Sequence, residues 1–156
     1  MSEDAKDRAG VIAPPPLIYL GFILVGLALE YVWPEPLLPE DVQYGLGAAL
    51  IALAFLIAIP TFVQFSRAKT NVDPYKPVTA IIRNGPFRWT RNPLYLGMVI
   101  VQLGVAAAVD GLWIAVLVIP TIFVVSIGVI VREERYLERK FGEEYLAYKA
   151  AVRRWV

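Results

Sequence analysis

Residues 112–131 read LWIAVLVIPTIFVVSIGVIV, a run of twenty positions without a charged side chain. A helix rises about 1.5 Å per residue, so this run would extend about 30 Å, the thickness of the hydrocarbon core of a bilayer. Three similar apolar runs precede it, at residues 17–32, 44–62 and 94–109. The chain of 156 residues is 58% hydrophobic, with a mean hydropathy of +0.57. We therefore predict an all-α polytopic membrane protein, with about four transmembrane helices in one domain over residues 1–156.

The basic residues are confined to three segments of the chain. All 15 Lys and Arg residues lie within residues 1–16, 64–93 and 132–156, whereas segments 33–41 and 110–111 contain none. Loops on the cytoplasmic side of a membrane are enriched in Lys and Arg. We therefore expect both termini and the long loop 64–93 in the cytoplasm, together with a helical C-terminal segment at 132–156.

Two residue types that dominate catalytic sites are missing. The chain contains no cysteine and no histidine, which excludes disulfide bonds, thiolate nucleophiles and a histidine base. Within the apolar runs, Glu30 is the one acidic residue, and we expect it to reach the outer interface. Proton and ion pathways normally show ionisable residues inside the membrane. We therefore expect the polar chemistry at the cytoplasmic face, without a metal ion or a nucleic-acid partner.

Short irregularities interrupt the apolar runs. Residues 109–111 leave room only for a tight turn, so the runs on either side should form an antiparallel hairpin. Pro60 and Pro120 lie within runs. Each should kink its helix or release a carbonyl group from hydrogen bonding.

The first polar segment of interest, residues 83–97, reads RNGPFRWTRNPLYLG and leads into the third apolar run. Pro93 suits the first turn of a helix, and Asn92 suits the N-cap position. Free backbone N–H groups at such a helix start can bind an anion such as a carboxylate. Gly97 would allow a ligand or another helix to approach closely. The alternative is an arginine-rich loop that only contacts lipid headgroups.

The second polar segment, residues 132–148, reads REERYLERKFGEEYLAY and follows the last apolar run. Gly142 fits the end of one helix, so a second helix should begin at Glu143, with Tyr145, Tyr148 and Val152 as its apolar stripe. Glu133 and Glu134 lie where the chain leaves the membrane, and burial there requires cationic partners, for which Arg88 and Arg91 are the candidates. The alternative is a charged helix that lies on the bilayer surface.

Together these segments resemble the isoprenylcysteine carboxyl methyltransferase family, which is grouped with the phospholipid methyltransferases. The resemblance covers residues 65–154 and includes the TNVDP stretch at 70–74. It implies a methyltransferase that uses S-adenosylmethionine, with a cytoplasm-facing pocket closed by the C-terminal helical segment. It also implies a lipid-like or prenylated acceptor that enters from the bilayer. Asn92 stands where many prenylcysteine enzymes have histidine.

The candidate catalytic residues are Arg88, Arg91 and Glu133, because a cationic side chain such as Arg88 or Arg91 could hold the carboxylate of the acceptor or of the cofactor. By position, the resemblance implies these residues for cofactor binding: Arg91, Asn92, Pro93, Tyr95, Leu96, Gly97, Glu133, Glu134, Leu137, Tyr145 and Tyr148. Methyl transfer mainly requires alignment, which can supply about 7–11 kcal/mol. A carboxylate acceptor is already a nucleophile at neutral pH and is favoured, whereas an amine would need Glu133 or Glu134 as a base.

Other functions stay open at this level. An ethanolamine phospholipid is an alternative acceptor. A sterol-type reductase shares a loosely similar Arg-x-Pro-x-Tyr-x-Gly element, and a small helical scaffold without enzymatic activity would have the same apolar pattern. We expect a prokaryotic plasma-membrane enzyme whose active site faces the cytoplasm, and the oligomeric state is left open.

Overall fold

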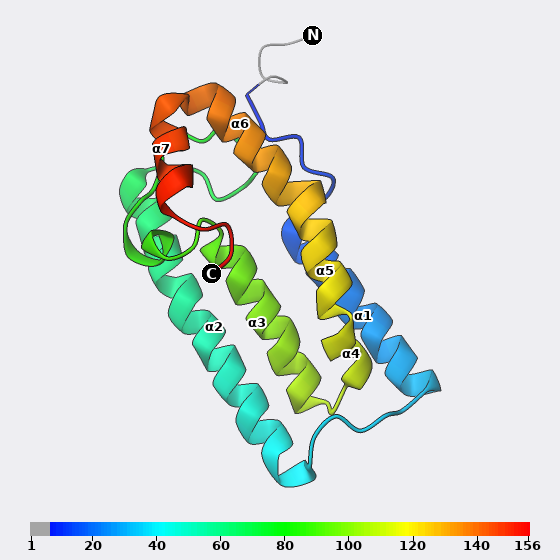
Figure 1. Ribbon diagram of the computed structural model, residues 1–156. Coiled ribbons are helices and arrows are strands. Elements are labelled where there is room, and N and C mark those ends of the chain that lie inside the picture. Colours follow the sequence, from blue (N-terminus) through cyan, green and yellow to red (C-terminus); the bar gives the residue numbers. More distant parts are fainter. Residues whose placement is uncertain (1–6) are drawn as a thin grey trace. The chain divides into compact units, whose positions relative to one another are not determined.

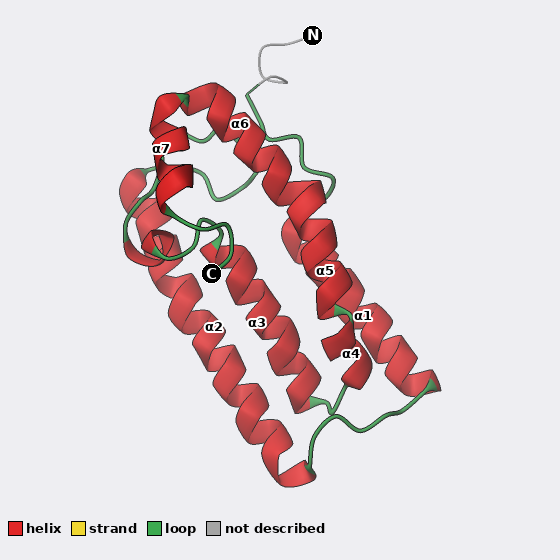
Figure 2. Ribbon diagram, in the orientation of Figure 1, coloured by secondary structure: helices red, strands yellow, loops and turns green. Residues whose placement is uncertain are grey.

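The computed structural model describes residues 7–156, and every regular element within that range is helical (Figures 1 and 2). This confirms the predicted all-α class. The elements are α1 (Pro15–Val32), α2 (Glu40–Ala68), the 3₁₀-helix η2 (Gly85–Arg88), α3 (Pro93–Ala108), α4 (Leu112–Val116), α5 (Val118–Val125), the π-helix η3 (Ser126–Ile130), α6 (Val131–Phe141) and α7 (Glu143–Ala151).

Three helical stretches are long and apolar enough to cross a membrane. They are Pro15–Val32, Glu40–Ala68 and Leu112–Phe141. Large apolar side chains on them are exposed, among them Leu56 at 71% and Ile119 at 75%, as expected of surfaces that face lipid. The run predicted at 94–109 forms the shorter apolar helix Pro93–Ala108, so three of the about four predicted spans reach the required length.

The chain divides into two compact units. The polar unit comprises the described part of Met1–Pro14 together with Ile57–Leu94 and Ser126–Val156. The apolar unit comprises Pro15–Leu56 and Tyr95–Val125.

Glycines allow close helix packing in the apolar unit. A Cβ atom on Gly26 of α1 would lie 2.6 Å from the Ile114 side chain and 2.9 Å from the Ile114 Cα atom. A Cβ atom on Gly47 of α2 would lie 2.9 Å from the carbonyl oxygen of Gly104 in α3. The absence of a side chain at these positions therefore lets α1 approach α4, and α2 approach α3, at backbone distance.

The tight turn predicted at 109–111 is present. Asp110 has a positive φ of 54°, and the Gly111 N–H group donates to the Ala106 carbonyl oxygen at 2.7 Å. The Asp110 carboxylate also accepts hydrogen bonds from the N–H groups of Leu37 and Leu38, each at 2.8 Å. This carboxylate therefore ties the α3–α4 turn to the segment that precedes α2.

Glu30 has a structural role that the sequence did not reveal. Its carboxylate accepts a hydrogen bond from the Trp113 N–H group at 2.8 Å, and the Trp113 indole donates to the Trp33 carbonyl oxygen at 2.7 Å. Free N–H groups at a helix start favour a nearby negative charge. Glu30 therefore caps the beginning of α4.

The two prolines within the spans behave differently. Pro60 lies inside α2 without ending it. Pro120 lacks the N–H group that would bind the Val116 carbonyl oxygen, and α4 ends at Val116. The helical stretch is thus interrupted at Leu117 before α5 begins, which agrees with the predicted effect of Pro120.

Candidate functional site

An aromatic cluster connects η2 with α7 in the polar unit. Phe87, Tyr145 and Tyr148 are buried at its centre, and the Tyr148 hydroxyl group donates to the Phe87 carbonyl oxygen at 2.8 Å. The predicted apolar stripe of α7 therefore packs inward. Partly buried side chains around this centre are Phe65, Ile81, Ile82, Leu137, Phe141 and Val152.

The turn between α6 and α7 lies where the sequence predicts it. Gly142 has a φ of 52°, a region that L-amino acids with side chains rarely adopt, and its N–H group donates to the Glu138 carbonyl oxygen at 3.0 Å. The second helix begins at Glu143, as expected. This turn brings the aromatic residues of α7 back along α6.

A buried ion pair joins the start of α3 to α6. The Arg91 guanidinium lies 3.1 Å from the Glu134 carboxylate, and their side chains are only 8% and 6% exposed. Arg154, near the C-terminus, donates to both carboxylate oxygens of Glu134, at 3.0 and 2.7 Å. Two guanidinium groups therefore offset the desolvation of one buried carboxylate, which would otherwise be strongly unfavourable.

The C-terminal tail, residues 152–156, is held against the segment before α3. The Arg91 N–H group donates to the Arg153 carbonyl oxygen at 2.9 Å. The Thr90 hydroxyl group and the Asn92 amide group both donate to the Arg154 carbonyl oxygen, at 3.1 and 2.8 Å. These bonds hold the tail against Arg91 and Asn92, two residues that the resemblance predicts for cofactor binding.

The Arg91 guanidinium has unused donors. Its Nε and Nη1 atoms are buried and have no hydrogen-bond partner among the described residues. A buried donor without an acceptor costs about 1–3 kcal/mol, and more when it is charged. An anionic group that reached these donors would satisfy them.

The tyrosines beside this pair stay neutral at physiological pH. Burial raises the pKa of Tyr148 to about 12. Burial also raises the pKa of Tyr145, and the negative charge of Glu134 adds to the effect. Hydrogen bonds to Glu134 raise the pKa of Arg154. The tyrosine hydroxyl groups are therefore poor bases, and the charged groups of the site are arginines and glutamates.

The remaining predicted site residues are distributed as follows. Arg88 is exposed, whereas Glu133 on α6 is half-buried. Tyr95, Leu96 and Gly97 continue α3 in the apolar unit, where the Tyr95 carbonyl oxygen accepts a hydrogen bond from Tyr19 at 3.0 Å. The polar unit thus contains the predicted residues Arg91, Asn92, Pro93, Glu134, Leu137, Tyr145 and Tyr148 close to the ion pair or the aromatic cluster.

Sequence reasoning missed several residues of this arrangement. Thr90, Arg153 and Arg154 join the loop to the tail, and Lys149 lies 4.0 Å from the Glu134 carboxylate. The adjacent arginines at 153 and 154 follow the tyrosine stripe of α7. They lie twenty positions after Glu133 and Glu134 in the sequence, so their pairing depends on how the tail folds back.

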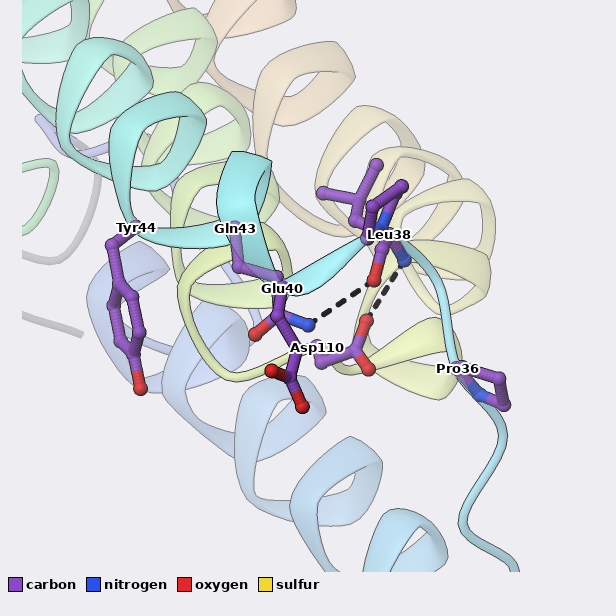
Figure 3. Close-up of a pocket in the computed structure, with 7 residues that line it drawn as sticks. Pro36, Leu38, Glu40, Gln43, Tyr44 and Asp110 are labelled. Carbon is purple, nitrogen blue, oxygen red and sulfur yellow. Dashed lines mark hydrogen bonds between the residues drawn. The ribbon is translucent and has the colours of Figure 1, made fainter.

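A pocket of the apolar unit lies at the turn before α2 (Figure 3). The Leu38 N–H group donates to Asp110, and the Gln43 amide group donates to the Leu38 carbonyl oxygen at 3.1 Å. None of the predicted site residues lines this pocket, and within residues 7–156 no group of three or more acidic, histidine or cysteine residues could hold a metal ion. Its lining residues are Pro36, Leu38, Pro39, Glu40, Gln43, Tyr44 and Asp110.

Comparison with known proteins places this arrangement in a family. An uncharacterised protein of Haemophilus influenzae (strain ATCC 51907 / DSM 11121 / KW20 / Rd) is 50% identical to the chain over 44 residues, which are 28% of this chain and 67% of that protein. No solved structure matches the chain. The sequence profile of phospholipid methyltransferases matches residues 42–144, which include α6 and the loop that carries Arg91. The chain therefore belongs to the phospholipid methyltransferase family, whose members use S-adenosylmethionine.

Proposed function

We propose that this protein transfers a methyl group from S-adenosylmethionine to a hydrophobic acceptor, in a site centred on Arg91 and Glu134. The single observation that carries the proposal is the pair of unused, buried donors of Arg91. S-adenosylmethionine, when bound, supplies an electrophilic methyl group on a sulfonium centre and also bears a carboxylate. The residues present fit such a ligand because a buried guanidinium binds carboxylates strongly.

Each residue of the site has a role that follows from its environment. Glu134 fixes the Arg91 guanidinium at 3.1 Å, so that its Nε and Nη1 donors are directed before a ligand arrives. The neutral rings of Tyr145 and Tyr148 offer aromatic faces, which favour a cationic group such as a sulfonium. The C-terminal tail covers the loop at Thr90–Asn92 and would limit the access of water.

We further propose that the acceptor is a carboxylate, as in prenylcysteine O-methylation. In that reaction a bond forms between a carboxylate oxygen and the methyl carbon, while the carbon–sulfur bond breaks and its electron pair stays on sulfur. No proton is transferred, which suits a site with raised tyrosine pKa values and no histidine.

A phospholipid amine is the second candidate acceptor, favoured by the description of the family. An amine loses a proton during methylation, and the half-buried carboxylate of Glu133 is then the candidate base. Under either reaction we propose that the polar unit lies at the cytoplasmic face of the plasma membrane, because it contains the basic residues of the chain.

The test is methyl transfer from labelled S-adenosylmethionine by the purified protein in detergent. One arm contains an N-acetylated, S-prenylated cysteine, and the other contains phosphatidylethanolamine in mixed micelles. We expect a product with the first acceptor that releases methanol in base, as an ester does. If only the lipid is methylated, and its product is stable in base, the acceptor is an amine and the carboxylate proposal is wrong. If neither acceptor is methylated and the protein does not bind S-adenosylhomocysteine, the methyltransferase proposal is overturned.

A further inference from the structure

A short strap precedes the first helix and binds to the polar unit. We define the strap as residues 7–14. The Ile12 N–H group donates to the Gly128 carbonyl oxygen at 3.2 Å, and Arg132 donates to the Gly10 carbonyl oxygen at 3.0 Å. A Cβ atom on Gly128 would overlap the Ile12 side chain. The strap therefore docks on η3 at a glycine that leaves room for it.

The hydroxyl group of Tyr136 is the point where the strap meets two other segments. Tyr136 is 3% exposed, and its hydroxyl group donates to the Asp7 carboxylate at 2.8 Å. The same oxygen accepts hydrogen bonds from the Val78 N–H group and the Lys140 ammonium group, each at 3.1 Å. Lys140 also binds both Asp7 oxygens, at 2.6 and 2.8 Å. One hydroxyl group thus joins the strap, the loop around Val78 and α6.

Helix α6 is consequently held from two directions. Glu134 and Glu138 on α6 bind Arg154 and Lys149 of the C-terminal segment, at 2.7 and 2.5 Å, whereas Tyr136 and its neighbours bind the strap. π-helical turns such as η3, directly before α6, occur frequently at functional sites. Helix α6 is therefore in contact with the strap through Tyr136 and Lys140 and with the C-terminal segment through Glu134 and Glu138.

We propose that Tyr136 is a positioning residue for the methyl-transfer site, and that its hydroxyl group holds α6 so that Glu134 meets Arg91. This inference rests on the proposed function, because the site that it positions is the one assigned there. Tyr136 itself lies among strap and loop groups, and its hydroxyl group forms hydrogen bonds with Asp7, Val78 and Lys140. Its effect on a ligand of Arg91 would be transmitted through α6.

The experiment compares the wild type with Tyr136→Phe and with the matched control Tyr75→Phe. Tyr75 lies in the same unit and is 38% exposed. Calorimetric titration with S-adenosylhomocysteine measures the dissociation constant and the stoichiometry separately. We expect the dissociation constant of Tyr136→Phe to rise about tenfold at unchanged stoichiometry, because buried hydrogen bonds are lost. Tyr75→Phe should match the wild type.

Hydrogen exchange of unliganded protein provides a readout that does not require the cofactor. In Tyr136→Phe we expect faster exchange in α6 and around Val78, with α7 unchanged. A lower stoichiometry with an unchanged dissociation constant would overturn the proposal, because it would mean that Tyr136 only supports folding. If the wild type does not bind S-adenosylhomocysteine, the methyltransferase assignment fails. In that case, faster exchange of Tyr136→Phe confined to α6 and the segment around Val78 would still support the positioning of α6 by Tyr136. Equally faster exchange along the whole chain would overturn it.

Discussion

Removing the charge of Glu134 should destabilise the protein more than any other single charge change in α6. In Glu134→Gln, the Arg91 guanidinium keeps its positive charge although its side chain is 8% exposed. Leaving one member of a buried ion pair without its partner costs about 3–5 kcal/mol. The side chain of Arg154 is 38% exposed, so water can solvate it when its partner is removed. We therefore expect the free energy of unfolding to fall by about 3 kcal/mol, the lower end of that range.

Glu138→Gln is the matched control for this change. Glu138 pairs with Lys149 at 2.5 Å, but these side chains are 30% and 37% exposed, and exposed pairs contribute at most about 1 kcal/mol. Thermal unfolding in detergent can be followed by tryptophan fluorescence. A chain of this size shifts its Tm by about 2–4 °C per kcal/mol, so we expect about 6–12 °C for Glu134→Gln and below about 4 °C for the control.

A double variant tests the physical cause. Arg91→Met removes the charge that Glu134→Gln leaves unpaired. The stability loss of the double variant should therefore be smaller than the sum of the losses of the two single variants, because the effects of substitutions at contacting residues do not add. Equal Tm shifts for Glu134→Gln and Glu138→Gln, or strict additivity in the cycle, would refute this reasoning.

Two further outcomes follow from contacts elsewhere in the chain. Gly26→Ala would place a Cβ atom 2.9 Å from the Ile114 backbone, whereas the Cβ atom of Gly21→Ala meets nothing within 4 Å. Gly26→Ala should therefore lower the Tm in detergent by the equivalent of about 1–3 kcal/mol. Gly21→Ala should leave the Tm equal or raise it. Hydrogen bonds from Lys140 and Tyr136 lower the pKa of Asp7 from its ordinary 3.8. The ionised Asp7 carboxylate therefore stabilises the folded chain fully above pH 3.8. This stabilisation is lost as the pH falls through the lowered pKa of Asp7. The exchange protection of the Tyr136 segment should thus differ between wild type and Asp7→Asn at pH 6 and converge in stronger acid; a constant difference would contradict this.

Several elements could be predicted because their causes are local in the sequence. Uncharged runs of sufficient length form helices whose backbone groups are satisfied internally in a bilayer, and α1, α2 and the stretch beginning at Leu112 follow this rule. Pro93 begins α3 because its ring fixes φ at a value that suits the first turn of a helix. Gly142 separates α6 from α7 because glycine can adopt a positive φ. The pairing of Arg91 with an α6 glutamate was also predictable, since a carboxylate buried at that depth needs a cation.

The remaining features depend on contacts between distant parts of the chain. Arg154 meets Glu134 only because the tail folds back after α7, and the strap reaches Tyr136 across more than a hundred residues. Glu30 was expected to reach the outer interface, and its hydrogen bond from the Trp113 N–H group at the start of α4 could not be predicted. No periodicity or local propensity distinguishes these partners from other charged residues, so the sequence could not predict which of them the folded chain brings together.

The most direct test of the account is calorimetric binding of S-adenosylhomocysteine to the detergent-purified protein, beside Arg91→Gln and the control Arg139→Gln. Arg139 is an exposed residue of α6, so its replacement removes the same charge without changing the buried pair. We expect saturable binding by the wild type and Arg139→Gln, and a dissociation constant at least about tenfold higher for Arg91→Gln. Equal binding by all three proteins would contradict the role of Arg91, and no binding by a folded wild type would contradict the methyltransferase function itself.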